Sequence, residues 1–317
     1  THYSSLYNYG VNRITRQLGH AQTWMWCAYY GSTPATDALF GVKYVISGDD
    51  MPAGYEPLAQ AGELTLWRNP DVLPLAFLAG DGGRPLTGET PFQRQDGLYA
   101  ALLGEDTALF APLAAEVETA PNETTLRLTG NGQPLYLDLS AGGLRELLVN
   151  GEHLLWLGSS EAASVHYLGA PAPGEEWTVT VRHSGAWAGT AWCLDLDALH
   201  TAVERLDTVS VTAVERGGRV RLSVPASGPR TLCTTIPAED GWTAWVDGKR
   251  TETGRWLDTF LTVELPEGAC QVELRYTAPG LIPGLALGLV SAAGWIGAYT
   301  IGNLQKKKYN EERGAAP

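Results

Sequence analysis

The feature that most constrains this chain is a long uncharged segment near its C-terminus. No charged side chain occurs between Arg275 and Lys306, and residues 281–301 are mostly Leu, Ile, Val, Ala, Gly and Trp. An α-helix rises about 1.5 Å per residue, so about 20 apolar residues cross a bilayer core about 30 Å thick. The sequence therefore predicts a transmembrane helix over residues 279–304, with the lipid bilayer as a partner.

The residues that follow this segment predict which side of the membrane each part occupies. Lys306, Lys307 and Lys308 form a basic cluster, and basic flanks of a membrane helix tend to stay on the cytoplasmic side. We therefore expect a cell-membrane protein whose bulk is extracytoplasmic and whose basic tail, residues 305–317, is cytoplasmic. Two alternatives remain open: a buried helix of a soluble domain, and a tail anchor behind a cytoplasmic domain.

Charge and metal-ligand content argue against several kinds of partner. The formal net charge is −13, whereas nucleic-acid binding needs a basic face. The cysteines and histidines show no metal-ligand spacing, so we expect no nucleic acid, no metal and no cofactor. Cys27, Cys193, Cys233 and Cys270 could form disulfides in an extracytoplasmic domain or remain buried thiols.

Strand patterns dominate the rest of the chain and predict a mainly β fold of the α+β class. Short β-rich runs recur between Gly, Pro, Asn and Asp turns, as in β-sandwiches. Asn150 and Gly151 form a strong hairpin signal. We divide the chain into a small mixed α/β segment (1–80), two β-sandwich-like domains (81–200 and 201–278), the transmembrane helix (279–304) and the tail (305–317).

Local signals in the N-terminal segment predict short elements. Thr36 and Asp37 are candidates to cap a turn of helix. Residues 64–67 and 73–78 are typical of strands. The nearby Pro70 and Pro74 predict that both strands lie at sheet edges, because proline cannot donate to a strand ladder.

The usual catalytic motifs are absent from the sequence. It contains no HExxH, Walker A, GxSxG or strand-linked GxGxxG pattern. Asp49 and Asp50 form an acidic pair that could bind a cation or act on a proton. A solvated turn is the simpler explanation of this pair.

An aromatic group near the N-terminus is a candidate contact surface. Trp24, Trp26, Tyr29 and Tyr30 could stack on a sugar or lie at the membrane interface. Packing in the core is the alternative. The same residue types therefore fit a glycan-contact site or an ordinary interior.

The apolar segment also carries a helix-packing signal. Gly284 and Gly288 form a GxxxG pair, and small residues let helix backbones approach closely inside a membrane. The sequence begins at Thr1, and no signal peptide precedes the domain in it. We therefore expect upstream transmembrane helices of the same protein to deliver the chain and to pack against this pair.

Several blocks of the sequence follow one another in a characteristic order: DALFGVKYVI at 37–46, LWRNP at 66–70, LPLAF at 73–77, IP at 236–237, GWTAWVDGK at 241–249, ELRY at 273–276 and PG at 279–280. Taken in this order, these blocks resemble the bacterial YfhO family of multi-spanning membrane proteins. The block at 241–249 is the most specific. We interpret its Trp242, Trp245, Asp247 and Gly248 as fold-defining and not catalytic, because Asp-Gly makes a hairpin turn.

The resemblance implies a multi-helix glycosyltransferase that uses a lipid-linked sugar. Family members have a long membrane domain, then a large outside region and a final helix, and this chain resembles the last two parts. The donor would be a polyprenyl-phosphate sugar and the acceptor a cell-envelope polymer. The catalytic carboxylate of that class usually lies in an early outside loop, so the resemblance assigns no catalytic residue to any position here.

A second hypothesis is a non-enzymatic, membrane-anchored envelope module that binds a glycan or a protein. The two hypotheses differ in what should lie upstream of residue 1. The enzyme predicts several spanning helices with an acidic residue in the first outside loop. The binding module predicts a signal peptide or a single anchor.

Overall fold

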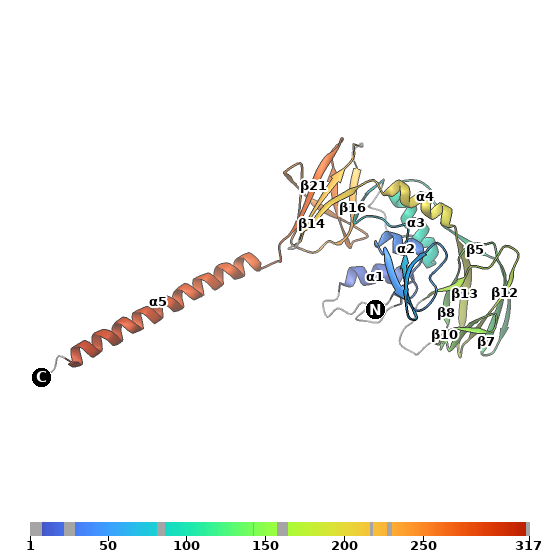
Figure 1. Ribbon diagram of the computed structural model, residues 1–317, viewed down its shortest axis with the longest axis horizontal. Helices are drawn as coiled ribbons and strands as arrows, with labels where there is room; N and C mark the ends of the chain where they lie inside the picture. Colours follow the sequence, from blue (N-terminus) through green and yellow to red (C-terminus); the bar gives the residue numbers. More distant parts are fainter. Residues whose placement is uncertain are drawn as a thin grey trace.

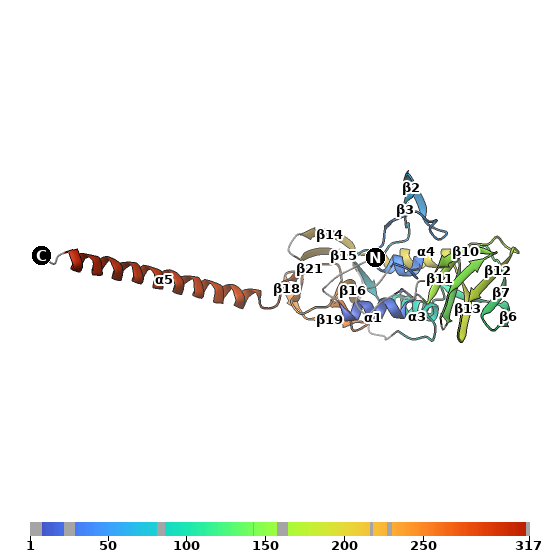
Figure 2. The same ribbon diagram turned by 90° about the horizontal axis from the view of Figure 1, so that it is seen from below.

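A computed structural model of the chain describes residues 8–21, 29–80, 86–141, 143–156, 164–215, 218–226 and 230–314. These residues form a body of β-sheets and short helices, from which one long helix, α5 (Leu281–Gly314), extends (Figure 1). A second view shows the same elongated shape (Figure 2). The chain is mainly β, which confirms the predicted fold class.

Two short helices open the described chain. In α1 (Tyr9–Gln17), the side chain of Asn8 accepts a hydrogen bond from Val11 N at 3.0 Å and caps the helix. The apolar Ile14 and Leu18 are buried on one face. Gly19, at φ 106°, follows the end of the helix, where glycine adopts a positive φ without strain.

The second helix, α2 (Pro34–Leu39), begins earlier than predicted. Its cap is Thr33, whose side chain accepts from Thr36 N at 3.2 Å, while Thr36 Oγ1 accepts from Thr33 N at 2.9 Å. The prediction of a cap at Thr36 and Asp37 was therefore wrong. The physical reason is Pro34, because proline suits a first helical position, where its missing N–H is not needed.

A small three-stranded antiparallel sheet stands out from the body (Figure 2). Its order is β1 (Tyr44–Ser47), β3 (Leu64–Arg68), β2 (Glu56–Ala61). We call it the projecting sheet. The strand at 64–68 is central, so its predicted edge position was wrong. Pro70 lies beyond the end of β3, and the last backbone donor before it, Asn69 N, still bonds Lys43 O at 2.9 Å.

The first β-sandwich consists of two antiparallel sheets. The five-stranded sheet has the order β10 (Glu152–Trp156), β9 (Glu146–Val149), β12 (Glu176–Arg182), β7 (Glu123–Thr129), β6 (Ala115–Ala120). The four-stranded sheet has the order β11 (Val165–Gly169), β8 (Leu135–Ala141), β13 (Trp187–Leu194), β5 (Phe110–Leu113). Alternate side chains such as Val179, Val181 and Leu137 fill one core. The β9–β10 turn has Asn150 at φ 52° and Gly151 at φ 84°, as its sequence predicted.

The second β-sandwich is completed by a strand from the N-terminal segment. Its five-stranded sheet has the order β14 (Ser210–Glu215), β15 (Arg219–Val224), β21 (Cys270–Tyr276), β17 (Trp242–Val246), β18 (Lys249–Thr251). Its four-stranded sheet has the order β19 (Thr253–Trp256), β20 (Phe260–Leu265), β16 (Arg230–Pro237), β4 (Ala76–Ala79). The strand after Pro74, β4, lies at the sheet edge, as predicted.

Two helices connect the sandwiches. They are α3 (Pro91–Leu103) and α4 (Leu196–Leu206), and Figure 1 places them between the two sets of sheets. The largest buried cluster runs through this region and includes Phe92, Tyr99, Leu199 and Trp256. One core therefore joins the N-terminal helices, the first sandwich and the second sandwich. The cysteines of the described residues, Cys193, Cys233 and Cys270, are buried free thiols.

The last helix is longer than the predicted span. It continues through the three lysines to Gly314, so the residues expected to form a tail after 304 extend the same helix. Lys, Gln and Glu are good helix formers, which explains the continuation. Its apolar part touches no part of the body: the most apolar window of the helix is 0% buried.

Candidate functional site

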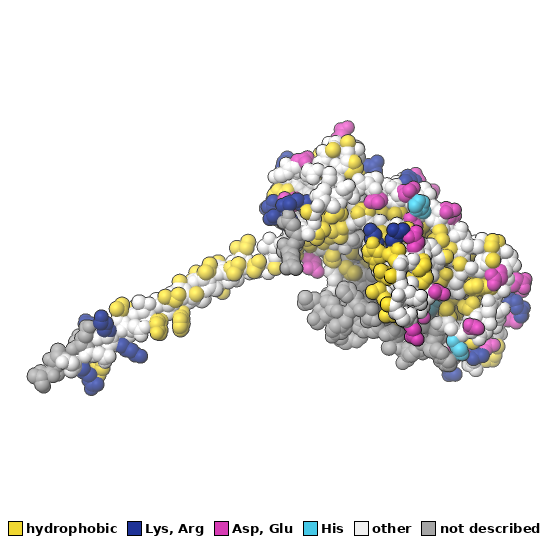
Figure 3. Space-filling model, in the orientation of Figure 1, with side chains coloured by type: hydrophobic (Ala, Val, Ile, Leu, Met, Phe, Trp, Pro, Cys, Tyr) yellow, Lys and Arg dark blue, Asp and Glu magenta, His cyan; other side chains and the backbone are white. Residues whose placement is uncertain are grey.

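The exposed apolar surface of α5 is the clearest functional feature of the structure. The helix over Leu281–Asn310 is long and apolar enough to cross a membrane. In the part of the chain that the structure describes, this is the one helix with that property. Figure 3 shows hydrophobic side chains along α5, with Lys and Arg gathered toward its far end. Apolar surface of this extent is unfavourable in water by about 25 cal/mol per Å², so a hydrocarbon environment suits it.

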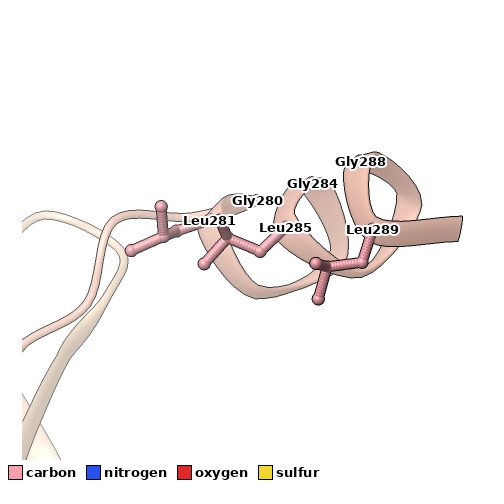
Figure 4. A pocket seen from close by; sticks show the side chains of 6 residues that line it. All are labelled: Gly280, Leu281, Gly284, Leu285, Gly288 and Leu289. Carbon is pink, nitrogen blue, oxygen red and sulfur yellow. The ribbon is translucent and has the colours of Figure 1, made fainter. Parts of the chain in front are cut away.

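The predicted helix-packing pair lies on open surface. Gly284 and Gly288, together with Leu281, Leu285 and Leu289, line a shallow groove at the start of α5 (Figure 4). A Cβ added at either glycine would meet nothing within 4 Å. The backbone here is accessible to another helix, and packing against such a helix stays a prediction.

An aromatic pair marks the other end of the apolar stretch. The rings of Trp295 and Tyr299 are stacked at 5.7 Å with an interplanar angle of 11°. They lie one turn apart and precede the lysines. Trp and Tyr are enriched where a membrane helix meets the headgroups, so this pair suits the boundary between hydrocarbon and the basic end of α5.

A second candidate site is a buried carboxyl group in α2. Asp37 is 2% exposed. The hydroxyl groups of Tyr29 and Tyr55 both donate to its Oδ2 atom. Among the described residues, its Oδ1 atom has no hydrogen-bond partner. Three separate parts of the chain, which carry Tyr29, Asp37 and Tyr55, therefore meet at one carboxyl group.

The environment of Asp37 changes how readily it ionises. Burial raises the pKa of Asp37 to about 7, and the hydrogen bonds from Tyr29 and Tyr55 oppose that effect only in part. Burial also raises the pKa of both tyrosines above the ordinary value of 10.0. Both phenols therefore remain hydrogen-bond donors at neutral pH, while Asp37 can gain or lose a proton.

Further polar side chains surround this carboxyl group. Tyr99 of α3 donates to Ala35 O at 2.8 Å. Tyr136 of β8 is 0% exposed, and within the described ranges its hydroxyl has no hydrogen-bond partner. The β2–β3 register, Glu56 opposite Arg68, places Tyr55 opposite Asn69 at the base of the projecting sheet. This arrangement can hold or release a proton; within the described ranges, no group of His, Cys, Asp or Glu could hold a metal ion.

Of the four aromatic residues predicted as a contact surface, Tyr29 and Tyr30 lie in the described part of the chain. Trp24 and Trp26 are outside the described residues. Tyr30 is exposed, whereas Tyr29 is half-buried and bonds Asp37. Contact of these aromatics with a glycan stays a prediction.

The predicted acidic pair is exposed, whereas Asp37, which the sequence did not predict as a site, is buried. Asp49 and Asp50 lie on the exposed turn after β1, where Asp49 N donates to Ser47 Oγ at 2.9 Å. The sequence predicts Asp37 only as a helix-capping residue. A carboxylate placed between Ala35 and Phe40, in an otherwise weakly polar stretch, was the available signal.

The block at 241–249 forms a hairpin. Asp247 and Gly248 have φ values of 49° and 77°, and Asp247 Oδ1 accepts from Gln271 N at 2.8 Å. The Trp245 ring lies 4.3 Å from the Arg275 guanidinium carbon. These contacts hold β17 against β21, consistent with a structural role for the block.

Comparison with known proteins identifies one family. The family model described as "Bacterial membrane protein YfhO" matches residues 1–134 and 135–288. No curated protein matches the chain. A conserved protein of unknown function from Pseudomonas aeruginosa PAO1 is similar at 12% identity over 53% of this chain and 82% of its own, with a TM-score of 0.16. An anti-sigma factor domain-containing protein is similar at 14% identity over 52% and 82%, also with a TM-score of 0.16.

Proposed function

This chain belongs to the YfhO family of bacterial membrane proteins, and we propose that it forms the extracytoplasmic portion and last membrane helix of a multi-spanning glycosyltransferase-like protein. The protein transfers a sugar from a polyprenyl-phosphate donor to a cell-envelope polymer. The catalytic membrane core lies outside this chain. The observation that carries the proposal is the uncovered apolar helix that directly follows the body and precedes a basic cluster.

The short connection between the body and α5 supports a role close to the bilayer. β21 ends at Tyr276 and α5 begins at Leu281. Thr277 N still bonds Gly241 O at 3.0 Å, so the free part of the connection is shorter than the gap between the elements. At about 3.5 Å per residue, the body is held within about 15 Å of the helix start. A donor whose lipid lies in the membrane would meet the body at that height.

Sidedness can be tested by labelling single cysteines in intact cells. Glu63→Cys, in the exposed β2–β3 turn, should react with a membrane-impermeant maleimide from outside. Gln305→Cys, beside the lysines, should react only after the membrane is permeabilised. The described native cysteines are buried, and the background strain carries Cys27→Ser. Labelling of the two sites in the opposite order would overturn the topology.

The transfer reaction can be tested with the full-length protein in lipid vesicles. We expect sugar from a radiolabelled polyprenyl-phosphate donor to appear in added envelope polymer. Gly288→Leu should reduce transfer, because a bulky side chain would block close helix approach. Gly297→Leu is the matched control, since it lies on another face of α5. Absence of transfer by the unmodified protein would refute the enzymatic proposal.

The alternative is a non-enzymatic module that binds a glycan or a protein. It is favoured by the lack of a recognisable catalytic motif in the sequence. The same vesicles separate the two ideas. Retention of labelled envelope polymer without any transfer of sugar would support the binding module.

A further inference from the structure

We propose that Asp37 is a proton-operated clasp, which holds the projecting sheet against the body when its carboxyl group is protonated and loosens when it ionises. This inference concerns regulation of the body and does not depend on sugar transfer. It stands on how the carboxyl group is connected and on how little else holds the projecting sheet.

The connection joins separate parts of the chain at one atom. Tyr55 immediately precedes β2, and Tyr29 precedes α2, yet both hydroxyls donate to Asp37 Oδ2. Loss of this acceptor inside the body would leave buried hydroxyl groups unsatisfied, which is unfavourable. The two phenols therefore fasten the base of the projecting sheet to α2 through a single side chain.

The projecting sheet has few other attachments. Every residue of β2 is exposed, as are Tyr44 and Ile46 of β1. Among the described residues, β1, β2 and β3 pair only with one another and with no strand of the sandwiches. Segments with few buried contacts open locally at a lower free energy than the core, so loss of the clasp should be felt in this sheet first.

Ionisation of Asp37 places negative charge on two buried oxygen atoms, only one of which has hydrogen-bond donors among the described residues. The two phenols satisfy Oδ2, whereas Oδ1 is buried without a described donor. A buried carboxylate oxygen without a donor is strongly unfavourable, and exposure to water relieves that penalty. Opening of the sheet base provides the exposure.

The titratable groups facing Asp37 do not offset this effect. Tyr29 and Tyr55 contact it directly. The charge of Asp37 also contributes to raising the pKa of Tyr99 of α3 and Tyr136 of β8. All four are neutral below pH 10, since the pKa of each is raised by burial. Asp71, which also acts on Tyr99, is paired with His200 at 2.6 Å. Within the described ranges, no recorded cation contacts Asp37.

The direction of the pH response follows from proton binding. The closed state holds the proton up to a pKa of about 7, whereas in the open state the pKa returns toward 3.8. Closure is therefore favoured most below pH 3.8 and loses that advantage as the pH rises to about 7. The opening equilibrium should grow about tenfold per pH unit in this window and level off above it.

The test is hydrogen exchange of the whole chain in lipid nanodiscs between pH 5 and pH 8, corrected for the intrinsic pH dependence of exchange. Peptides covering residues 44–68 should show opening that increases about fiftyfold from pH 5 to 7. Asp37→Asn cannot ionise and should remove this dependence. Asp49→Asn, on the exposed turn after β1, is the matched control and should behave as the unmodified chain.

A third variant keeps the test decisive if Asp37→Asn fails to fold. Tyr55→Phe preserves the ring and removes one donor to the carboxylate, so the pH window should move upward. The clasp is refuted if the projecting sheet of the unmodified chain exchanges independently of pH. It is also refuted if Asp37→Asn retains the dependence, or if Tyr55→Phe leaves the window unchanged.

Discussion

A single arginine in the middle of α5 tests whether this helix is built to lie in lipid. Val290 is 69% exposed in the structure and lies about 14 Å along the helix from Leu281, close to the centre of a hydrocarbon core about 30 Å thick. In water, Val290→Arg would be a mild surface substitution. In a bilayer, it would place a charge at the most unfavourable depth.

The expected magnitude can be worked out from the composition of the span. Residues 281–301 contain eight Leu, Ile and Val side chains, and each favours insertion by about 0.3 to 0.6 kcal/mol at the helix centre. Together they supply about 2 to 5 kcal/mol. A central arginine opposes insertion by about 2.5 to 3.5 kcal/mol, and the valine contribution is lost as well. One substitution should therefore cancel most of the driving force.

The assay is insertion of residues 281–314 into microsomal membranes, within a reporter that carries glycan acceptor sites on both sides of the helix. The unmodified helix should insert in most molecules, and Val290→Arg should lower the inserted to non-inserted ratio about a hundredfold. Asn310→Arg adds the same charge beyond the lysines and should change little. Equal insertion of Val290→Arg and the unmodified helix would refute the reasoning.

Two further predictions concern the body, each measured by urea unfolding of the chain in detergent micelles, followed by circular dichroism. Trp256→Phe should lower the free energy of unfolding by about 1 to 3 kcal/mol, because it removes the buried bond from Trp256 Nε1 to Thr234 O at 2.7 Å. Trp245→Phe, at a half-exposed ring, should cost less than about 1 kcal/mol. Glu146→Gln should cost about 2 kcal/mol, because this buried carboxylate lies 2.6 Å from an arginine and from a histidine; Glu118→Gln, in an exposed pair, should cost less than about 0.5 kcal/mol. If a variant and its own control lost the same free energy of unfolding, the argument for that pair would be contradicted.

Local patterns were sufficient for elements whose environment follows from their own residues. The alternation in β12 is typical of a strand, and Val179 and Val181 are fully buried on one face. Asn150 and Gly151 predicted their own turn, because positive φ is a property of those residues. The length and apolar composition of its own residues likewise predicted the helix α5.

Long-range contacts account for what the sequence did not reveal. The burial of Asp37 depends on Tyr29 and Tyr55, and neither the pairing nor its depth has a local signature. The central position of β3 depends on partners on both sides, so the proline that follows it misled the prediction. Likewise, the sequence suggested that β4 lies at an edge but not which sheet it joins.

The pairing of β4 with β16 sets the order in which the body can mature during synthesis. A ribosome releases residues 76–79 long before residues 230–237, so the nascent strand waits with its hydrogen-bonding edge unpaired. Pairing across so many intervening residues is slow. The last strand of the other sheet, β21, ends at Tyr276 and therefore leaves the ribosome almost together with α5. Chaperones that shield exposed strands would therefore protect the edge of β4 until β16 emerges.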